Sequence, residues 1–101
     1  MKETTQLVSH ITPVGGNVFA DLGFTAPESN KLKLKAQLMS QISEWIKQQK
    51  LKQEDAAKIF NVNRPRVSDV MRGKVGNFTI DALVDMVEKT GSQVVLSIEE
   101  A

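Results

Sequence analysis

The chain has 101 residues, of which 41% are hydrophobic and 25% charged, and its formal net charge is +1. This length and composition predict one small globular domain rather than several. Because cysteine is absent, disulfides and thiolate chemistry are excluded, which fits a reducing compartment. No apolar run approaches the ~20 residues that cross a bilayer, and the N-terminal residues lack the apolar core of a secretion signal. We therefore expect a cytoplasmic protein that does not contact a membrane.

Charge is distributed unevenly along the chain. Residues 50–74 contain seven lysines and arginines against three acidic residues, whereas residues 75–101 contain one lysine against five acidic residues. A local basic stretch indicates an anionic partner more directly than the net charge does. Chance patterning in a short chain is the alternative.

Residues 1–16 are polar, with Pro13 and the pair Gly15–Gly16 near their end. They predict a flexible tail because they offer little apolar surface to offset the entropy of ordering. A partner-binding peptide is the alternative interpretation. His10 is the only histidine, so no metal site and no cofactor are predicted. The remaining residues, 17–101, are predicted to form the domain.

Residues 17–24 predict a short helical turn ended by Gly23, with apolar side chains that we expect to pack on the domain: Phe19, Leu22 and Phe24. Thr25 and Glu28 match a capping box, which marks the start of a helix over residues 26–50. Apolar residues recur along this helix at helical spacing. They are Leu32, Ala36, Met39, Ile42, Trp45 and Ile46, widened by Leu34 and Leu38. Trp45 is interpreted as a core anchor rather than a ligand-stacking residue.

Residues 51–74 predict two short helices, 53–60 and 64–72, joined by a tight turn. Asn61 lies where the chain leaves the first helix with positive φ, which asparagine tolerates. Asn63 suits an N-cap, and proline at position 65 is tolerated in the first turn. The residues expected to be buried on the first helix are Ala56, Ala57, Ile59 and Phe60.

The second helix of this pair has one apolar stripe, Val67, Val70 and Met71, and it stops at Gly73. Its other side is basic and polar, which suits the DNA major groove, where arginine donates to guanine O6 and N7. We expect Arg64, Arg66 and Ser68 to contact base edges. We expect Gln53, Arg72 and Lys74 to contact phosphates.

Asp69 has two interpretations: it accepts a hydrogen bond from cytosine N4, or it orients Arg66 or Arg72. The full set predicted to bind DNA is Gln53, Asn63, Arg64, Arg66, Ser68, Asp69, Arg72 and Lys74. The alternative is an ordinary helical hairpin with a solvated face.

After Lys74 the chain turns, and Thr79 is expected to cap a helix over residues 80–90, with Phe78 and Leu83 as a hydrophobic staple. Its core-facing residues are expected to be Ile80, Leu83, Val84 and Val87. Residues 93–98 change to a period of two, which predicts a short strand. A lone strand needs a partner, which could come from the N-terminal region, a second copy or another protein. We therefore expect a homodimer.

Catalysis is not expected. The sequence contains no cysteine, no pair of histidines, no glycine-rich phosphate loop and no serine nucleophile elbow. Asp81 and Asp85 share helical spacing but are expected on the solvent face of their helix.

Residues 51–73 resemble the helix-turn-helix of XRE-type (Cro/cI-like) regulators in several features: Gln53, Ala57, Val62 and the run NRPRVSDVMRG. The segment NVFADLGF, the long helix, the helix-turn-helix and the strand-like end together resemble HigA-type antitoxins. The resemblance covers residues 17–98. It implies a mainly α fold: a four- to five-helix Cro/cI-like domain with a short C-terminal strand. It also implies a homodimeric repressor of a palindromic double-stranded operator that neutralises a RelE/HigB-like toxin. A stand-alone phage-type repressor without a toxin is the alternative.

Overall fold

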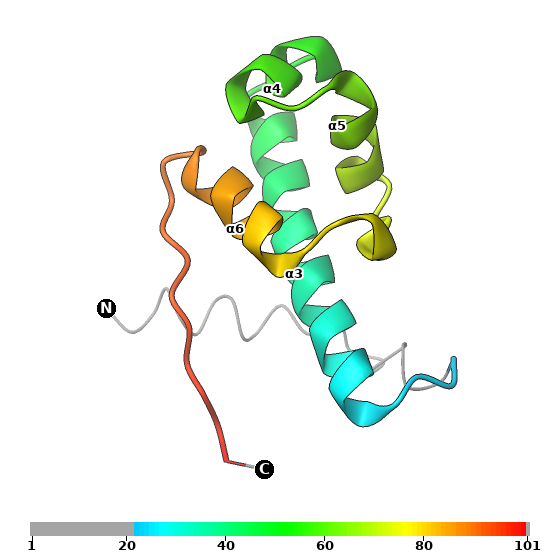
Figure 1. The fold of residues 1–101 in the computed structure, drawn as a ribbon. Helices are drawn as coiled ribbons and strands as arrows, with labels where there is room; N and C mark the ends of the chain where they lie inside the picture. Colours follow the sequence, from blue (N-terminus) through cyan, green and yellow to red (C-terminus); the bar gives the residue numbers. More distant parts are fainter. Residues whose placement is uncertain (1–21, 101) are drawn as a thin grey trace.

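The computed structural model describes residues 22–100, which form a mainly helical domain (Figure 1). Its elements in chain order are α3 (Ala26–Gln48), α4 (Gln53–Phe60), α5 (Arg64–Met71), the 3-10 turn η1 (Val75–Asn77) and α6 (Ile80–Glu88). The predicted helices are therefore confirmed, with ends that differ by one or two residues. The predicted tail, 1–16, and the residues 17–21 of the predicted helical turn lie outside the described residues. None of the described helices is both long enough and apolar enough to cross a membrane.

The start of α3 is set by the predicted capping box. The Glu28 amide donates to Thr25 Oγ1 at 3.4 Å, and the Thr25 amide donates to Glu28 Oε1 at 3.0 Å. These bonds satisfy two amides that the helix itself leaves without partners. Hydrogen bonds that the Glu28 carboxylate accepts from Thr25, first from its backbone amide and then from its side chain, hold the pKa of the Glu28 carboxyl below its ordinary value.

The helices α3, α4 and α5 are each followed, within two residues of their last residue, by a residue with left-handed backbone conformation. These residues are Lys50 (φ 55°), Asn61 (φ 58°) and Gly73 (φ 72°). At each end, the following amide donates back across five residues, as in a Schellman motif. These bonds join Leu51 to Ile46, Val62 to Ala57 and Lys74 to Asp69, at 3.1, 3.0 and 3.0 Å. Positive φ at Asn61 confirms its prediction. Lys50 was expected inside the long helix, but α3 ends at Gln48 and Lys50 forms the turn.

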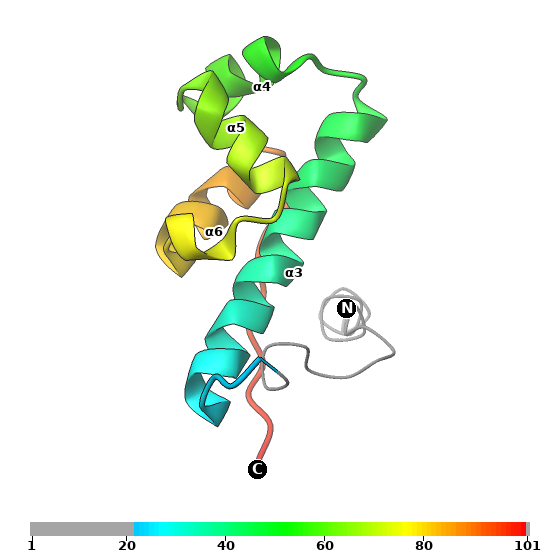
Figure 2. The ribbon, with the colours of Figure 1, turned by 90° about the vertical axis from the view of Figure 1, so that its right-hand side faces the viewer.

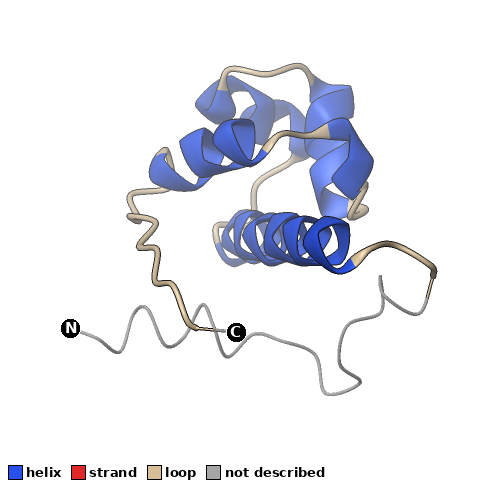
Figure 3. Ribbon diagram, turned by 60° about the horizontal axis from the view of Figure 1, so that its bottom comes forward, coloured by secondary structure: helices blue, strands red, loops and turns tan. Residues whose placement is uncertain are grey.

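The other three helices pack on one side of α3, toward its C-terminal end (Figures 2 and 3). Between them lies one core of buried apolar side chains: Met39, Ile42, Ile46, Ala56, Ala57, Phe60, Val67, Val70, Phe78, Leu83, Met86 and Val87. Burying a side chain of the size of valine, leucine or phenylalanine contributes about 1.5–3 kcal/mol. The small side chains of Ala56 and Ala57 are the α4 positions at which neighbouring helices can approach most closely.

The predicted staple and cap position α6. Thr79 Oγ1 accepts from the Ala82 amide at 3.1 Å, and Phe78 and Leu83 are both buried. Beyond the far end of α6, Lys89 Nζ donates to the Phe60 carbonyl at 3.1 Å. This bond satisfies a carbonyl at the end of α4, where a cation is also favoured by the helix dipole.

Several residues predicted to be buried are exposed. Leu22, Phe24 and Leu34 are exposed because the N-terminal half of α3 extends beyond the other helices, so none of the helices within residues 22–100 covers them. Ile59 is 41% exposed because α4 buries only a narrow face around Ala56 and Phe60. On α6, the residues predicted to face the core include Ile80 and Val84, which are only half-buried, whereas Met86 is buried.

The strand predicted over residues 93–98 is not formed within residues 22–100, and Figure 3 shows this segment as loop. A strand requires a neighbour to accept and donate backbone hydrogen bonds, and no described segment supplies one. Val94 packs partly against the core. The predicted strand has Val94, Leu96 and Ile98 on one side, and two of these three, Leu96 and Ile98, are 76% and 89% exposed.

Candidate nucleic-acid interface

Helix α5 begins at an N-terminus that favours anions. Asn63 Oδ1 accepts from the Arg66 amide at 3.0 Å, so Asn63 is the predicted N-cap, and Pro65 lies in the first turn. No acidic residue lies in that turn, whereas Arg64 and Arg66 both do. The positive end of the helix dipole and two cations therefore add together, an arrangement that suits phosphate.

The inner side of α5 is defined by Val67 and Val70, which are fully buried, and by Met71, which is half-buried. Since an α-helix turns once in about 3.6 residues, the positions farthest from this stripe are Pro65, Asp69 and Arg72. Arg64 and Ser68 lie on the flank next to Met71. Arg66 lies on the opposite flank, next to Val70.

Arg64, Arg72 and Lys74 are exposed, and Ser68 is half-buried at the edge of the same surface. The structure therefore brings these predicted residues together on α5 and on the turn that follows it. Their number and charge match an electrostatic footprint for a polyanion. Their contacts with individual bases or phosphates stay predictions.

Arg66 does not extend outward from α5. Its guanidinium lies 4.1 Å from the centre of the Phe78 ring, and its Nη1 donates to the Asn77 carbonyl at 2.9 Å. Arg66 was expected at a base edge, but in this structure its side chain is directed along the flank of α5 to the turn at residues 75–78.

Asp69 is held by the same turn. Asn77 Nδ2 donates to Asp69 Oδ2 at 3.2 Å, and Asp69 forms no ion pair with Arg66 or Arg72 in the part of the chain that the structure describes. The interpretation that Asp69 orients an arginine directly is therefore not supported by these contacts. An acceptor role toward a base stays a prediction.

Gln53 lies half-buried between the start of α4 and the end of α5. Its Nε2 is 3.9 Å from Met71 Sδ, the length of a weak hydrogen bond to sulfur. In this structure Gln53 therefore connects the two helices of the motif, and its contact with phosphate stays a prediction.

Sequence reasoning missed the participation of Asn77 and Phe78 in this surface. Asn77 was not singled out, and Phe78 was predicted only as part of a staple. Neither residue is within a helical turn of Arg66, so no local spacing indicates the contact. The available signal in the sequence was that Phe78 lies directly before Thr79, the cap of α6. This signal predicts that the Phe78 ring is buried, but it does not predict that the ring contacts an arginine.

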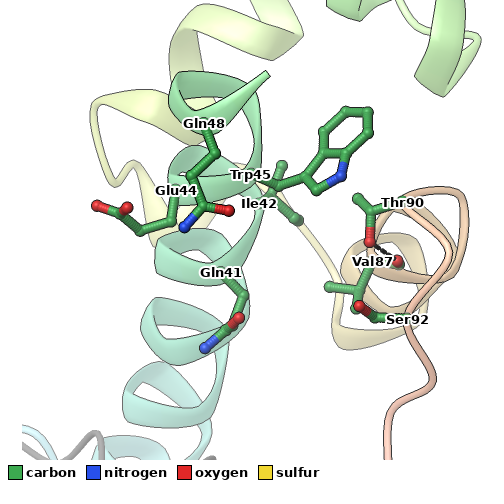
Figure 4. Close-up of a pocket in the computed structure, with 8 residues that line it drawn as sticks. All are labelled: Gln41, Ile42, Glu44, Trp45, Gln48, Val87, Thr90 and Ser92. Atoms are coloured by element: carbon green, nitrogen blue, oxygen red, sulfur yellow. Dashed lines mark hydrogen bonds between the residues drawn. The ribbon is translucent and has the colours of Figure 1, made fainter. Parts of the chain in front are cut away.

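The residues that line a pocket come from α3 and from the end of α6 with the segment that follows it (Figure 4). Gln41, Glu44 and Gln48 line it from α3, with Thr90 and Ser92 opposite. Trp45 also lines it, and the Trp45 ring meets Phe60 edge-to-face, with centroids 5.7 Å apart and planes at 69°. This contact confirms the prediction that Trp45 packs where α3 meets the two-helix motif.

The arrangement of α4, a tight turn and a basic α5 packed on α3 defines a DNA-binding helix-turn-helix domain. The chain belongs to the helix-turn-helix domain family, whose model matches residues 18–99. No curated protein and no solved structure matches the chain.

Proposed function

We propose that this protein is a sequence-specific transcriptional regulator that binds a palindromic operator. The observation that carries the proposal is the outer surface of α5 and its turn, where Arg64, Arg72 and Lys74 are exposed beside a helix N-terminus without acidic residues. Arginine at the start of such a helix provides base readout, and lysine beyond it provides phosphate contacts. Regulation of transcription also agrees with the cytoplasmic location expected from the sequence.

The regulator acts as a homodimer in this proposal. Two helix-turn-helix units read half-sites about 34 Å apart when a two-fold axis relates them. The exposed side chains of Leu96 and Ile98 support such an assembly, since a second copy of residues 93–98 would supply the missing neighbouring strand and cover them.

We further propose that the regulator is an antitoxin that represses its own operon and neutralises a RelE/HigB-like toxin. This proposal is supported by the resemblance to HigA-type proteins and by apolar side chains that DNA binding does not use. Phe24 and Leu34, at the extended end of α3, are 44% and 43% exposed. Exposed apolar residues of this size suit a protein partner.

A salt titration of DNA binding tests the regulator. The probes are duplex DNA from immediately upstream of the gene and a scrambled duplex of equal length. We expect about 10³-fold tighter binding to the upstream DNA. Arg64→Ala should reduce this preference, whereas Lys31→Ala on α3, which removes an equal charge, should leave it intact. Equal binding to both duplexes that disappears as salt rises would refute sequence-specific regulation.

Sedimentation equilibrium tests the dimer. The double substitution Leu96→Glu, Ile98→Glu should give a monomer, because it places charges on the side expected to be covered. The matched control, Gln93→Glu with Ser97→Glu, adds the same charge to the other side and should stay dimeric. Monomeric wild-type protein at concentrations that saturate the operator would contradict this assembly.

Co-expression with the product of the adjacent gene tests the antitoxin. We expect the full chain to restore growth that this product arrests, and to co-purify with it. Variants lacking residues 1–16 or 93–101 locate the inhibitory segment. If the neighbouring product is harmless or is not bound, the protein acts as a stand-alone repressor and the antitoxin proposal is wrong.

A further inference from the structure

Arg66, on one flank of α5, and Asp69, on its outer side, are half-buried, whereas Arg64 and Arg72 are exposed. The side chains of Arg66 and Asp69 both contact the segment that follows the helix, and both contacts involve Asn77. Its carbonyl accepts from Arg66 and its side-chain amide donates to Asp69, at 2.9 and 3.2 Å. The Phe78 ring lies beneath the Arg66 guanidinium. We call Arg66, Asn77 and Phe78 the Arg66 clamp.

The contacts of the clamp favour keeping Arg66 in place. A guanidinium within about 6 Å of a ring centre is attracted by the π electrons, more strongly when water is excluded, and here the separation is 4.1 Å. Phe78 is 3% exposed, so its ring is fixed by the core. A hydrogen bond from a charged donor is also stronger than one between neutral groups. Moving Arg66 to a base edge would require both contacts to break.

We propose that Arg66 is a positioning residue that holds the turn at residues 74–78 against α5, rather than a residue that reads a base. This inference rests on the proposed DNA-binding function and refines it. The residues that remain for base readout are then Arg64, Ser68 and Asp69, the last through Oδ1, the oxygen that does not accept from Asn77. Because Asp69 Oδ2 accepts a hydrogen bond from Asn77, the Asp69 side chain is already oriented before DNA binds. Less side-chain conformational entropy is therefore lost on binding.

The clamp also helps to fix where Lys74 lies relative to α5, because Lys74 joins the end of the helix to η1. The bond from the Lys74 amide to the Asp69 carbonyl acts in the same direction. A phosphate contact sets the register of a helix on DNA without carrying sequence information. Loss of the clamp should therefore weaken binding to every sequence by a similar factor. Loss of a base-reading arginine should instead abolish preference at one base pair.

Fluorescence anisotropy with the best-bound duplex of a randomised pool and all its single-base-pair variants separates these outcomes. We expect Arg66→Ala to bind about tenfold more weakly with an unchanged order of preference at every position. Phe78→Leu should produce part of the same loss, and the double variant should be no worse than Arg66→Ala alone. Arg66→Lys, which keeps a cation over the ring, should recover much of the affinity. Arg64→Ala is the control that should flatten preference at one base pair.

A second measurement does not depend on the folding of the Phe78 variant. The Arg66 side-chain protons of the wild-type protein should show an upfield ring-current shift by NMR, and this shift should persist when DNA is added. Disappearance of the shift in the complex, or flattened preference at one base pair in Arg66→Ala, would overturn the clamp and leave the regulator proposal intact. Absence of any preferred duplex for the wild-type protein would overturn both proposals.

Discussion

Replacement of Lys50 by glycine should stabilise the domain. Lys50 has φ 55° and joins α3 to α4, and its amide donates to the Lys47 carbonyl at 3.0 Å. A side chain in left-handed conformation costs about 1–2 kcal/mol, while glycine loses about 0.5–1 kcal/mol more than other residues through the entropy of the unfolded chain. The net effect should be a gain of about 0.5–1 kcal/mol in the free energy of unfolding.

Thermal and urea unfolding measure this gain, which corresponds to about 2–8 °C in the midpoint for a domain of this size. Lys58→Gly is the matched control, because it makes the same chemical change at an exposed position inside α4. It should destabilise the domain by about 1 kcal/mol. Gly73→Ala should also destabilise it, because φ is 72° there, although within the described residues no atom beyond the two chain neighbours lies within 4 Å of the added carbon. If Lys50→Gly lowers stability as Lys58→Gly does, the assignment of strain to Lys50 is wrong.

Two other contacts give measurable expectations. Lys89→Met should lower the free energy of unfolding by about 1 kcal/mol, because the Phe60 carbonyl loses the donor that lies 3.1 Å away; Lys58→Met is the control and should change little. The pKa of Glu28 is lowered in the folded chain, so its contribution is present above the ordinary carboxyl pKa of about 4.3 and is lost as pH falls through the lower folded value. An NMR titration of the Glu28 carboxyl should show this low pKa, and Thr25→Ala should raise it only part of the way toward the ordinary value, because the variant loses the side-chain bond but keeps the backbone amide that donates to Glu28 Oε1. An unchanged pKa in that variant would show that the Thr25 side chain does not contribute to the shift.

Local signals in the sequence predicted the helices well. Thr25 with Glu28, Asn63 and Thr79 were each identified as caps, and each makes the expected bond to an amide three residues further along the chain. Such bonds depend on side chains and amides that any helix start brings together, so residue type and spacing are sufficient to predict them. The positive φ of Asn61 followed from the same kind of reasoning.

Burial was predicted less well because it depends on which faces the packed helices cover. Leu34 has the spacing of a core residue, yet it is exposed because α3 continues past its neighbours. Ile59 on α4 was likewise predicted to be buried and is exposed. Periodicity identifies an apolar side of a helix, but only the lengths and directions of the packed helices decide how much of that side is covered.

The sequence by itself determined that this chain contains two short helices around a tight turn, with a basic second helix, because caps, turn residues and apolar spacing act over a few residues. Only the tertiary structure decided where the basic side chains lie. Arg64 and Arg66 are the same residue type two positions apart, and helical spacing places them on opposite flanks of α5, but it does not show that one is exposed and the other lies over Phe78. That difference arises because the chain reverses after α5 and returns Asn77 and Phe78 to the flank of the helix, a contact across eleven or twelve residues that no local pattern encodes.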